Sequence, residues 1–307
     1  MFVLIFTSVL MMLLYMAMGF GLCKVNKATV SHAKSMSAVL LYIMNPAMLI
    51  NSFLQLEYTH ENLIKIGKYF CASFIVQIIF FGLLFLCFHK KYRDAKYRIL
   101  SAGGVLGNVG FMGMPLIASI FPDEPIVLCY SSINVTTMNL IVFTIGVYLI
   151  TNDKEYVKLK NAILNPTSLA ILVSLPLFLL NVKLPEVILN AIGILAKAVT
   201  PMCMIILGMR LSASRLKDVF SRPFVYATAV IKLIIFPIFA FLLVKLLPFL
   251  DPVAKTTVIV LTTVPAGAVI ESLAELHECE QEFAANVVLL TTIISVITIP
   301  VMISVLV

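Results

Sequence analysis

The chain has 307 residues, of which 61% are hydrophobic and 12% are charged, and its mean hydropathy is +1.08. Soluble domains have about 45–50% apolar and about 25% charged residues, so this composition excludes a soluble globular protein and indicates an integral membrane protein. The net charge of +7 does not indicate a nucleic-acid partner, because in a membrane protein an excess of lysine and arginine mainly reports orientation.

Ten apolar segments are long enough, at about 20 residues each, to cross a bilayer as helices. In chain order they are residues 2–23, 35–56, 62–88, 99–120, 126–150, 164–182, 188–209, 224–248, 253–274 and 284–306. The connections between them are short, so no soluble domain is expected. The first segment follows no basic residue and precedes no small-residue cleavage site, which favours a membrane helix over a signal peptide.

Basic residues concentrate in alternate loops, at residues 24–34, 89–98, 151–160 and 210–222. By the positive-inside rule these loops are cytoplasmic, and both termini are external. The sequence therefore predicts a multi-pass protein of the plasma membrane.

The ten helices divide into two units of five, residues 1–150 and 164–307, which are joined by a short cytoplasmic linker at 151–163. A unit with an odd number of helices enters the membrane from the opposite side when it is repeated. The fold class expected is therefore an all-α integral membrane protein built from two inverted five-helix repeats, an arrangement typical of secondary transporters.

Residues that break helices interrupt the fourth and ninth segments. The fourth contains "GNVGFMGMPLI", with Gly110, Gly113 and Pro115, and the ninth contains Pro265 and Gly267. Proline frees a backbone carbonyl, and free backbone is tolerated in a membrane only against protein or a wet cavity. Each breaker alone could be an ordinary kink, but breaks in corresponding helices of both halves indicate a substrate site.

Polar residues near the breaks are candidate ligands. Asn108 lies beside the opened backbone of the fourth segment, Asn134 lies in the fifth, and Asn45 precedes Pro46 in the second, where we expect another break. Pro201 occupies the position in the seventh segment that corresponds to Pro46, and we expect a break there too. The alternative for each asparagine is a hydrogen bond between helices.

Four motifs resemble those of the auxin efflux carrier family of permeases. They are "NPAML" in the second segment, "GNVGFMGMPL" in the fourth, "TPMCMIILGMRLS" in the seventh and "VPAGAVIESLAEL" in the ninth. The short loops are similar to those of the prokaryotic branch, because the plant carriers have a long central loop.

The resemblance implies the fold of bile-acid symporters and sodium–proton antiporters. In that fold the interrupted fourth and ninth helices cross at mid-membrane, between a scaffold domain and a mobile transport domain. The matching residues here are Asn108, Gly110, Pro115, Pro265 and Gly267. The chain departs from the plant pattern after "P-x-G", where Ile270 and then Glu271 stand in place of a second proline.

The predicted function is secondary transport, by efflux, of small organic anions such as dicarboxylates, because half-helix N-termini suit carboxylates. A sodium-coupled importer and a non-transporting receptor of the same fold are the alternatives. Glu271 is the one acidic residue expected within the membrane, either at the crossing or at the cytoplasmic mouth, and is a candidate for ion coupling.

An enzyme is not expected, since no Ser/His pair, paired aspartates or metal triad lies at depth in the segments. We expect no cofactor, no metal site and no nucleic-acid partner. The expected partners are a small organic anion and the lipid bilayer, and the sequence leaves open whether the chain forms a homodimer.

Overall fold

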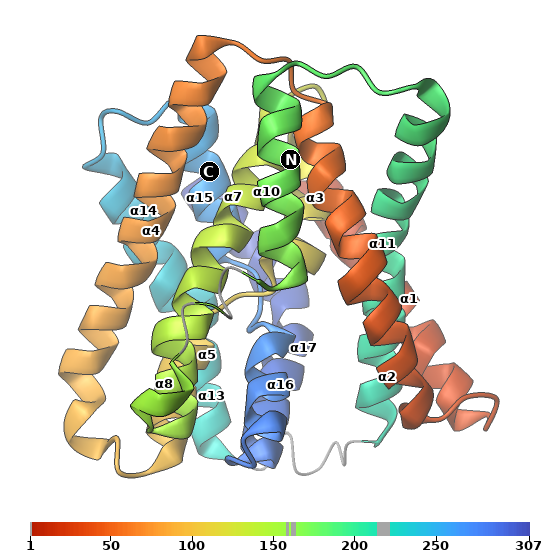
Figure 1. The fold of residues 1–307 in the computed structure, drawn as a ribbon. Helices are drawn as coiled ribbons and strands as arrows, with labels where there is room; N and C mark the ends of the chain where they lie inside the picture. Colours follow the sequence, from red (N-terminus) through yellow and green to blue (C-terminus); the bar gives the residue numbers. More distant parts are fainter. Residues whose placement is uncertain (1, 158–159, 161–163, 214–221) are drawn as a thin grey trace.

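The computed structural model describes residues 2–157, 160, 164–213 and 222–307, and these are almost entirely helical (Figure 1). No β-strand forms within those ranges, where an isolated antiparallel bridge pairs Gly107 with Ala266. The basic residues Lys158, Arg215 and Lys217 of two expected loops lie outside the described residues.

The first half of the chain contains eight α-helices with short π-helical or 3₁₀ turns between some of them. They are α1 (Phe2–Lys24), α2 (Val30–Val39), η1 (Leu40–Met44), α3 (Asn45–Leu54), α4 (His60–Phe88), η2 (His89–Lys91), α5 (Ala95–Val105), η3 (Val109–Gly113), α6 (Met114–Ile120), α7 (Ile126–Ile141), η4 (Val142–Gly146) and α8 (Val147–Thr151). The 3₁₀ turn η5 (Lys154–Tyr156) follows in the connection to the second half.

The second half is also helical. Its elements are α10 (Pro166–Leu179), α11 (Glu186–Ala213), α13 (Pro223–Val230), η6 (Ile231–Ile235), α14 (Phe236–Lys245), α15 (Pro252–Thr262), α16 (Ala268–Leu276) and α17 (Gln281–Leu306).

Seven helical segments of the described chain are long and apolar enough to cross a membrane, so the protein is a multi-pass membrane protein. Three further apolar segments are shorter, namely Val109–Ile120, Pro166–Leu179 and Pro252–Thr262. Each of the ten segments expected from hydropathy contains helix, but the fourth and the ninth are each divided into two short helices by non-helical chain.

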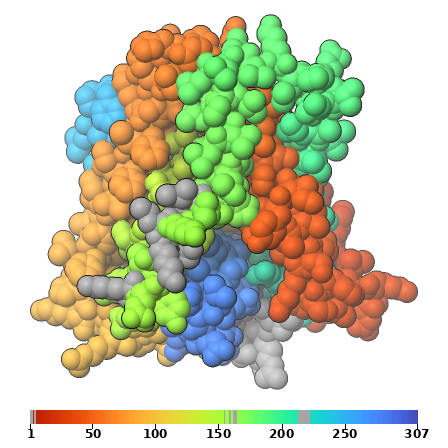
Figure 2. All heavy atoms as spheres, in the orientation of Figure 1, coloured from red at the N-terminus to blue at the C-terminus, as the bar shows by residue number. Residues whose placement is uncertain are grey.

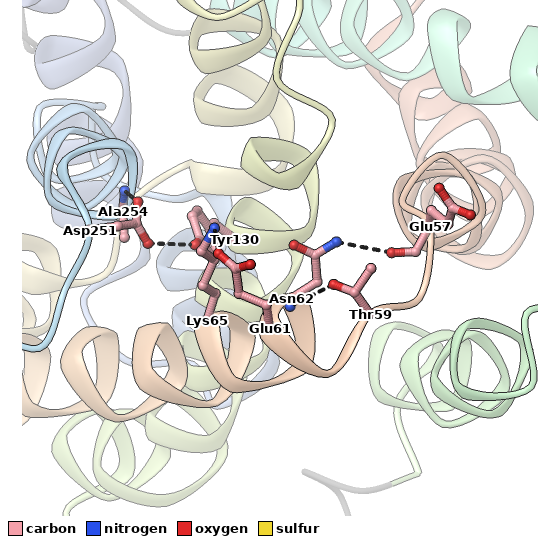
Figure 3. A network of polar contacts seen from close by, with 8 residues as sticks. All are labelled: Glu57, Thr59, Glu61, Asn62, Lys65, Tyr130, Asp251 and Ala254. Carbon is pink, nitrogen blue, oxygen red and sulfur yellow. Dashed lines mark hydrogen bonds and ion pairs between the residues drawn. The ribbon is translucent and has the colours of Figure 1, made fainter.

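Side-chain caps fix where several helices begin. Thr59 accepts a hydrogen bond from the backbone N–H of Asn62 at the start of α4, and Asp251 accepts one from Ala254 at the start of α15. These caps satisfy backbone donors that a helix leaves unpaired. Asp251 also accepts a hydrogen bond of 2.9 Å from the Tyr130 hydroxyl, which ties α7 to the start of α15 (Figure 3).

The helices form two groups, and each group combines elements from both halves of the chain. We call α1, α2, α3, α10 and α11 the outer group, because α1 packs along α11, and α3 packs against α10 and α11. We call α4 to α8 with α13 to α17 the crossing group, because it contains both divided segments. In Figure 1 α1, α2 and α11 stand to one side of α5, α13 and α16.

Two glycines allow α1 and α11 to approach closely. A Cβ atom added at Gly19 would overlap the backbone carbonyl of Ile205, and one added at Gly208 would overlap that of Met16. Small residues are the usual means by which membrane helices bring their backbones together, so this pair fixes the outer group.

The two groups meet along several helices. Element η3 contacts α11, α6 and α17 contact α1, and α7 contacts α3 and α10. The Ser52 and Ser132 hydroxyls are 2.7 Å apart across the α3–α7 contact. In the space-filling view the C-terminal part of the chain, in blue, reaches the surface between α8 and α1 (Figure 2).

Candidate functional site

The fourth segment is broken at Leu106–Asn108, between α5 and η3, and the ninth is broken at residues 263–267, between α15 and α16. The first break is narrower than "GNVGFMGMPLI" led us to expect. Gly113 and Pro115 lie inside the helix that resumes at Val109, with Pro115 in the first turn of α6. Proline is tolerated there because the π-helical turn before it has already shifted the hydrogen-bonding pattern.

The two breaks cross and are joined by backbone hydrogen bonds. The N–H of Asn108 donates to the Pro265 carbonyl over 2.8 Å, and the N–H of Gly267 donates to the Leu106 carbonyl over 3.0 Å. The N–H of Ala266 donates to the Thr291 hydroxyl over 3.1 Å. Buried backbone therefore finds partners inside the protein, as a membrane requires.

Glycine is required at the crossing by close approach. A Cβ at Gly267 would lie 3.0 Å from the Gly107 carbonyl oxygen, and a Cβ at Gly107 would lie 2.9 Å from Lys232 Nζ. A side chain at Gly267 would press on the backbone of the other break, whereas one at Gly107 would meet the side chains of Lys232 and Val264.

Lys232 lies beside the C-terminal ends of α5 and α15, where the two helices stop at the crossing. Its side chain is completely buried, with 0% of its surface exposed. Its Nζ donates to the Val105 carbonyl over 3.2 Å and to the Thr262 carbonyl over 3.4 Å. It also lies 4.7 Å from the centre of the Phe236 ring. Val105 and Thr262 are the last residues of α5 and α15, so the ammonium group touches the negative ends of both half-helices.

A small cavity with a mainly apolar lining adjoins Lys232. Its lining includes Ser73, Gln77 and Asn134, and it offers about 10 Å³ to the centre of a water-sized sphere, which is room for about one water molecule. Gln77 Nε2 donates to the Ser73 and Thr137 hydroxyls at 3.1 and 3.0 Å. Asn134 Nδ2 lies 3.5 Å from the Tyr69 hydroxyl.

The structure brings three of the predicted residues together at the crossing, namely Asn108, Pro265 and Gly267. Asn108 is 6% exposed, and its side chain makes no hydrogen bond with the rest of the described chain. Gly110 is half-buried in η3, where a Cβ would lie 3.6 Å from Val135 of α7. Asn134 lines the cavity beside Lys232 together with Gly107 and Val109, the residues that flank Asn108 in the chain.

Three predicted residues lie away from the crossing, in the outer group. Asn45 Nδ2 donates to the Thr167 hydroxyl of α10 over 3.3 Å, and its side-chain oxygen is buried without a partner in the described chain. The helix break expected at Pro46 is a π-helical turn, η1, that leads directly into α3. The break expected at Pro201 does not form, because α11 continues through it.

Glu271 lies one turn inside α16 and is 8% exposed. Its Oε2 is 3.3 Å from Nη1 of Arg210 in α11. The ring of His277, just after α16, meets that of Tyr156 at 4.8 Å, so α16 runs from the crossing toward the loop at 151–160. Glu271 therefore joins the crossing group to the outer group.

Lys232 and Arg210 are the site residues that sequence reasoning missed. Lys232 lies nine residues after the start of α13, in the middle of an apolar segment. An ionisable residue at that depth is itself an indication of function.

Comparison with known proteins identifies the family. The family model described as "Membrane transport protein" matches residues 4–303. An uncharacterized transporter of Methanocaldococcus jannaschii is 24% identical over 309 residues, which cover 97% of this chain and 96% of the relative. The protein is a membrane transporter, and its chain belongs to the membrane transport protein family, the auxin efflux carrier family that its motifs resemble.

Proposed function

We propose that this protein is a secondary transporter that releases small organic anions, such as dicarboxylates or related carboxylates, by alternating access. The observation that carries the proposal is the crossing of two broken helices, which the backbone bonds at Asn108 and Gly267 hold together. The helices that resume there, η3–α6 and α16, begin at the crossing. Their N-termini carry partial positive charge, which favours a carboxylate group.

Asn108 is the proposed neutral ligand. The residue is 6% exposed and its side chain makes no hydrogen bond within the described chain, so its amide is available to a ligand. Asn108 lies directly before η3, which contacts α11 of the outer group. An anion bound there would lie between the two groups.

Alternating access follows from the two groups of helices. The crossing group carries the site, and we propose that it moves against the outer group as a rigid body. The ten segments would form two inverted five-helix repeats, with both termini external and the basic loops in the cytoplasm. The supporting observations are the concentration of lysine and arginine in alternate loops and the presence of one divided segment in each half.

The membrane potential would supply the energy. A carboxylate that leaves the cell gains about 2.3 kcal/mol per charge per 100 mV. No acidic side chain lines the described cavity beside Lys232, so the structure offers no paired carboxylates there for proton antiport.

The test is flux from proteoliposomes with a potassium diffusion potential set by valinomycin. A panel of C2–C6 carboxylates and indole-acetate is loaded, and efflux is expected to rise with an inside-negative potential and to be unchanged when choline replaces sodium. A strict sodium requirement would favour a coupled importer instead. Saturable binding without flux would indicate a receptor.

A further inference from the structure

Lys232 is a fully buried ionisable side chain that anion binding at Asn108 does not use. Its ammonium group joins two carbonyls, Val105 and Thr262, that lie 127 and 30 positions away in the chain. None of the ion pairs in the described chain includes Lys232. A cation is costly in an apolar interior unless it is compensated, so something other than a carboxylate must offset its charge.

The ends of two helices supply that compensation. The C-terminus of an α-helix carries about half a negative charge, and α5 and α15 both end at Lys232. Two such ends together balance about one positive charge. The face of the Phe236 ring, 4.7 Å away, adds a further favourable contact.

Carbonyl groups at the ends of broken helices are also the ligands with which transporters hold a coupling cation. We propose that the Lys232 ammonium is a built-in cation at a site of this kind, and that a variant without it binds a soluble monovalent cation between the Val105 and Thr262 carbonyls. The consequence for transport, which rests on the proposed function, is that the native protein needs no sodium.

The surroundings of the ammonium group determine which probe suits the site. A Cβ at Gly107 would already lie 2.9 Å from Nζ, so the group is closely surrounded on that side. Lys232→Ala removes three methylene groups and the ammonium group. The removed atoms have the size and shape of a propylammonium ion. Propylammonium is therefore the first probe and sodium the second.

The primary experiment measures the melting temperature (Tm) of purified protein in choline, sodium and propylammonium chloride at equal ionic strength. The native protein is expected to melt at the same temperature in all three. Lys232→Ala loses two charge-assisted hydrogen bonds, so in choline its Tm should fall by about 10 °C. Propylammonium or sodium should restore at least half of that loss.

Two variants serve as controls. Lys232→Met fills the same space with an apolar chain, so it should lose stability without rescue by either cation. Lys245→Ala removes an exposed lysine whose Nζ also lies over a ring, that of Phe241 at 4.0 Å, and its melting should not respond to propylammonium.

The proposal would be overturned if propylammonium or sodium raised the Tm of Lys232→Met or Lys245→Ala as much as that of Lys232→Ala. It would also be overturned if Lys232→Ala had the Tm of the native protein in choline, or if neither cation raised its Tm. If Lys232→Ala aggregates on purification in choline, purification in propylammonium is expected to give a monodisperse protein. Aggregation in both salts would contradict a cation site.

The melting experiment needs no substrate, so it stands or fails separately from the proposed anion transport. Where flux is measurable, native flux should not depend on sodium, whereas flux of Lys232→Ala should require sodium or propylammonium. Native flux that follows a pH gradient and loses that dependence in Lys232→Met would show instead that Lys232 carries a coupling proton.

Discussion

Arg210 and Glu271 form an ion pair that joins the two groups of helices, with 3.3 Å between Nη1 and Oε2. Arg210 Nη1 is buried and makes no hydrogen bond within the described chain, so the attraction is electrostatic. Both side chains keep some contact with the surface, at 23% and 11% exposure, and this moderates the energy of the pair.

Breaking this pair is expected to change both stability and transport. Glu271→Gln or Arg210→Gln leaves one charge unpaired, so each should lower the Tm, whereas the double variant should lose less than the sum. A double-mutant cycle on thermal unfolding should give a coupling energy of about 1 kcal/mol. Additive losses would show that the two residues do not interact.

The same variants test ion coupling. Glu271→Gln is expected to change the rate of anion flux without altering its dependence on sodium or pH, because Glu271 serves as a contact between the groups. If Glu271→Gln abolishes a strict proton or sodium requirement of the native protein, then Glu271 is a coupling residue and the proposal of potential-driven flux is wrong.

Asn108→Ala is expected to reduce flux by about 10- to 100-fold, because a hydrogen bond to a charged group contributes about 1.5–3 kcal/mol. Expression and the size-exclusion profile should stay near those of the native protein, since the Asn108 side chain has no described protein partner to lose. The matched control is Asn139→Ala, on the half-buried part of α7, which should transport normally. Parallel loss of folding in Asn108→Ala would indicate a packing role.

The close contact of α1 with α11 predicts that alanine lowers the Tm at one of two nearby glycines and leaves it almost unchanged at the other. Gly19→Ala would overlap the Ile205 backbone, whereas a Cβ at Gly21 would meet nothing within 4 Å. Overpacking costs about 1–3 kcal/mol, so Gly19→Ala should lower the Tm by up to about 10 °C. Gly21→Ala should melt within about 2 °C of the native protein, because Ala also favours helix. Equal melting of both variants would contradict the contact.

Orientation can be tested by cysteine labelling. Ser214, on an expected cytoplasmic loop, lies outside the described residues, so we choose Lys90 with Asp123, both of which are exposed. A cysteine at Lys90 should react only with reagent on the cytoplasmic side and one at Asp123 only from outside. The four native cysteines that are not buried are first replaced; they are Cys23, Cys71, Cys87 and Cys279. The reverse labelling pattern would invert the proposed topology.

The sequence by itself predicted the features that depend on local composition. Hydropathy located each helical segment, because an apolar run of membrane length has few alternatives to a helix. Glycine and proline located the two broken segments, because these residues weaken a helix wherever they occur. The motifs around Asn108 and Pro265 identified the family before any geometry was available.

The local sequence did not predict which prolines break a helix or what each asparagine bonds to, because contacts with other helices decide both. Pro201 carries the same chemistry as Pro265, yet α11 continues through it while the chain at Pro265 is not helical. Only at Pro265 does a second broken helix offer partners, through Asn108 and Leu106, that replace the lost helical hydrogen bonds. Asn45 likewise bonds to α10 and not to the crossing.

The tertiary structure alone decided the role of Lys232. In the sequence it is one lysine in an apolar segment, and nothing local indicates which face of the helix it occupies. Its two acceptors come from helices that end far apart in the chain and meet only when the breaks cross. The stability of a buried charge depends on the dipoles around it. The dipoles of α5 and α15 meet at Lys232 only in the folded protein.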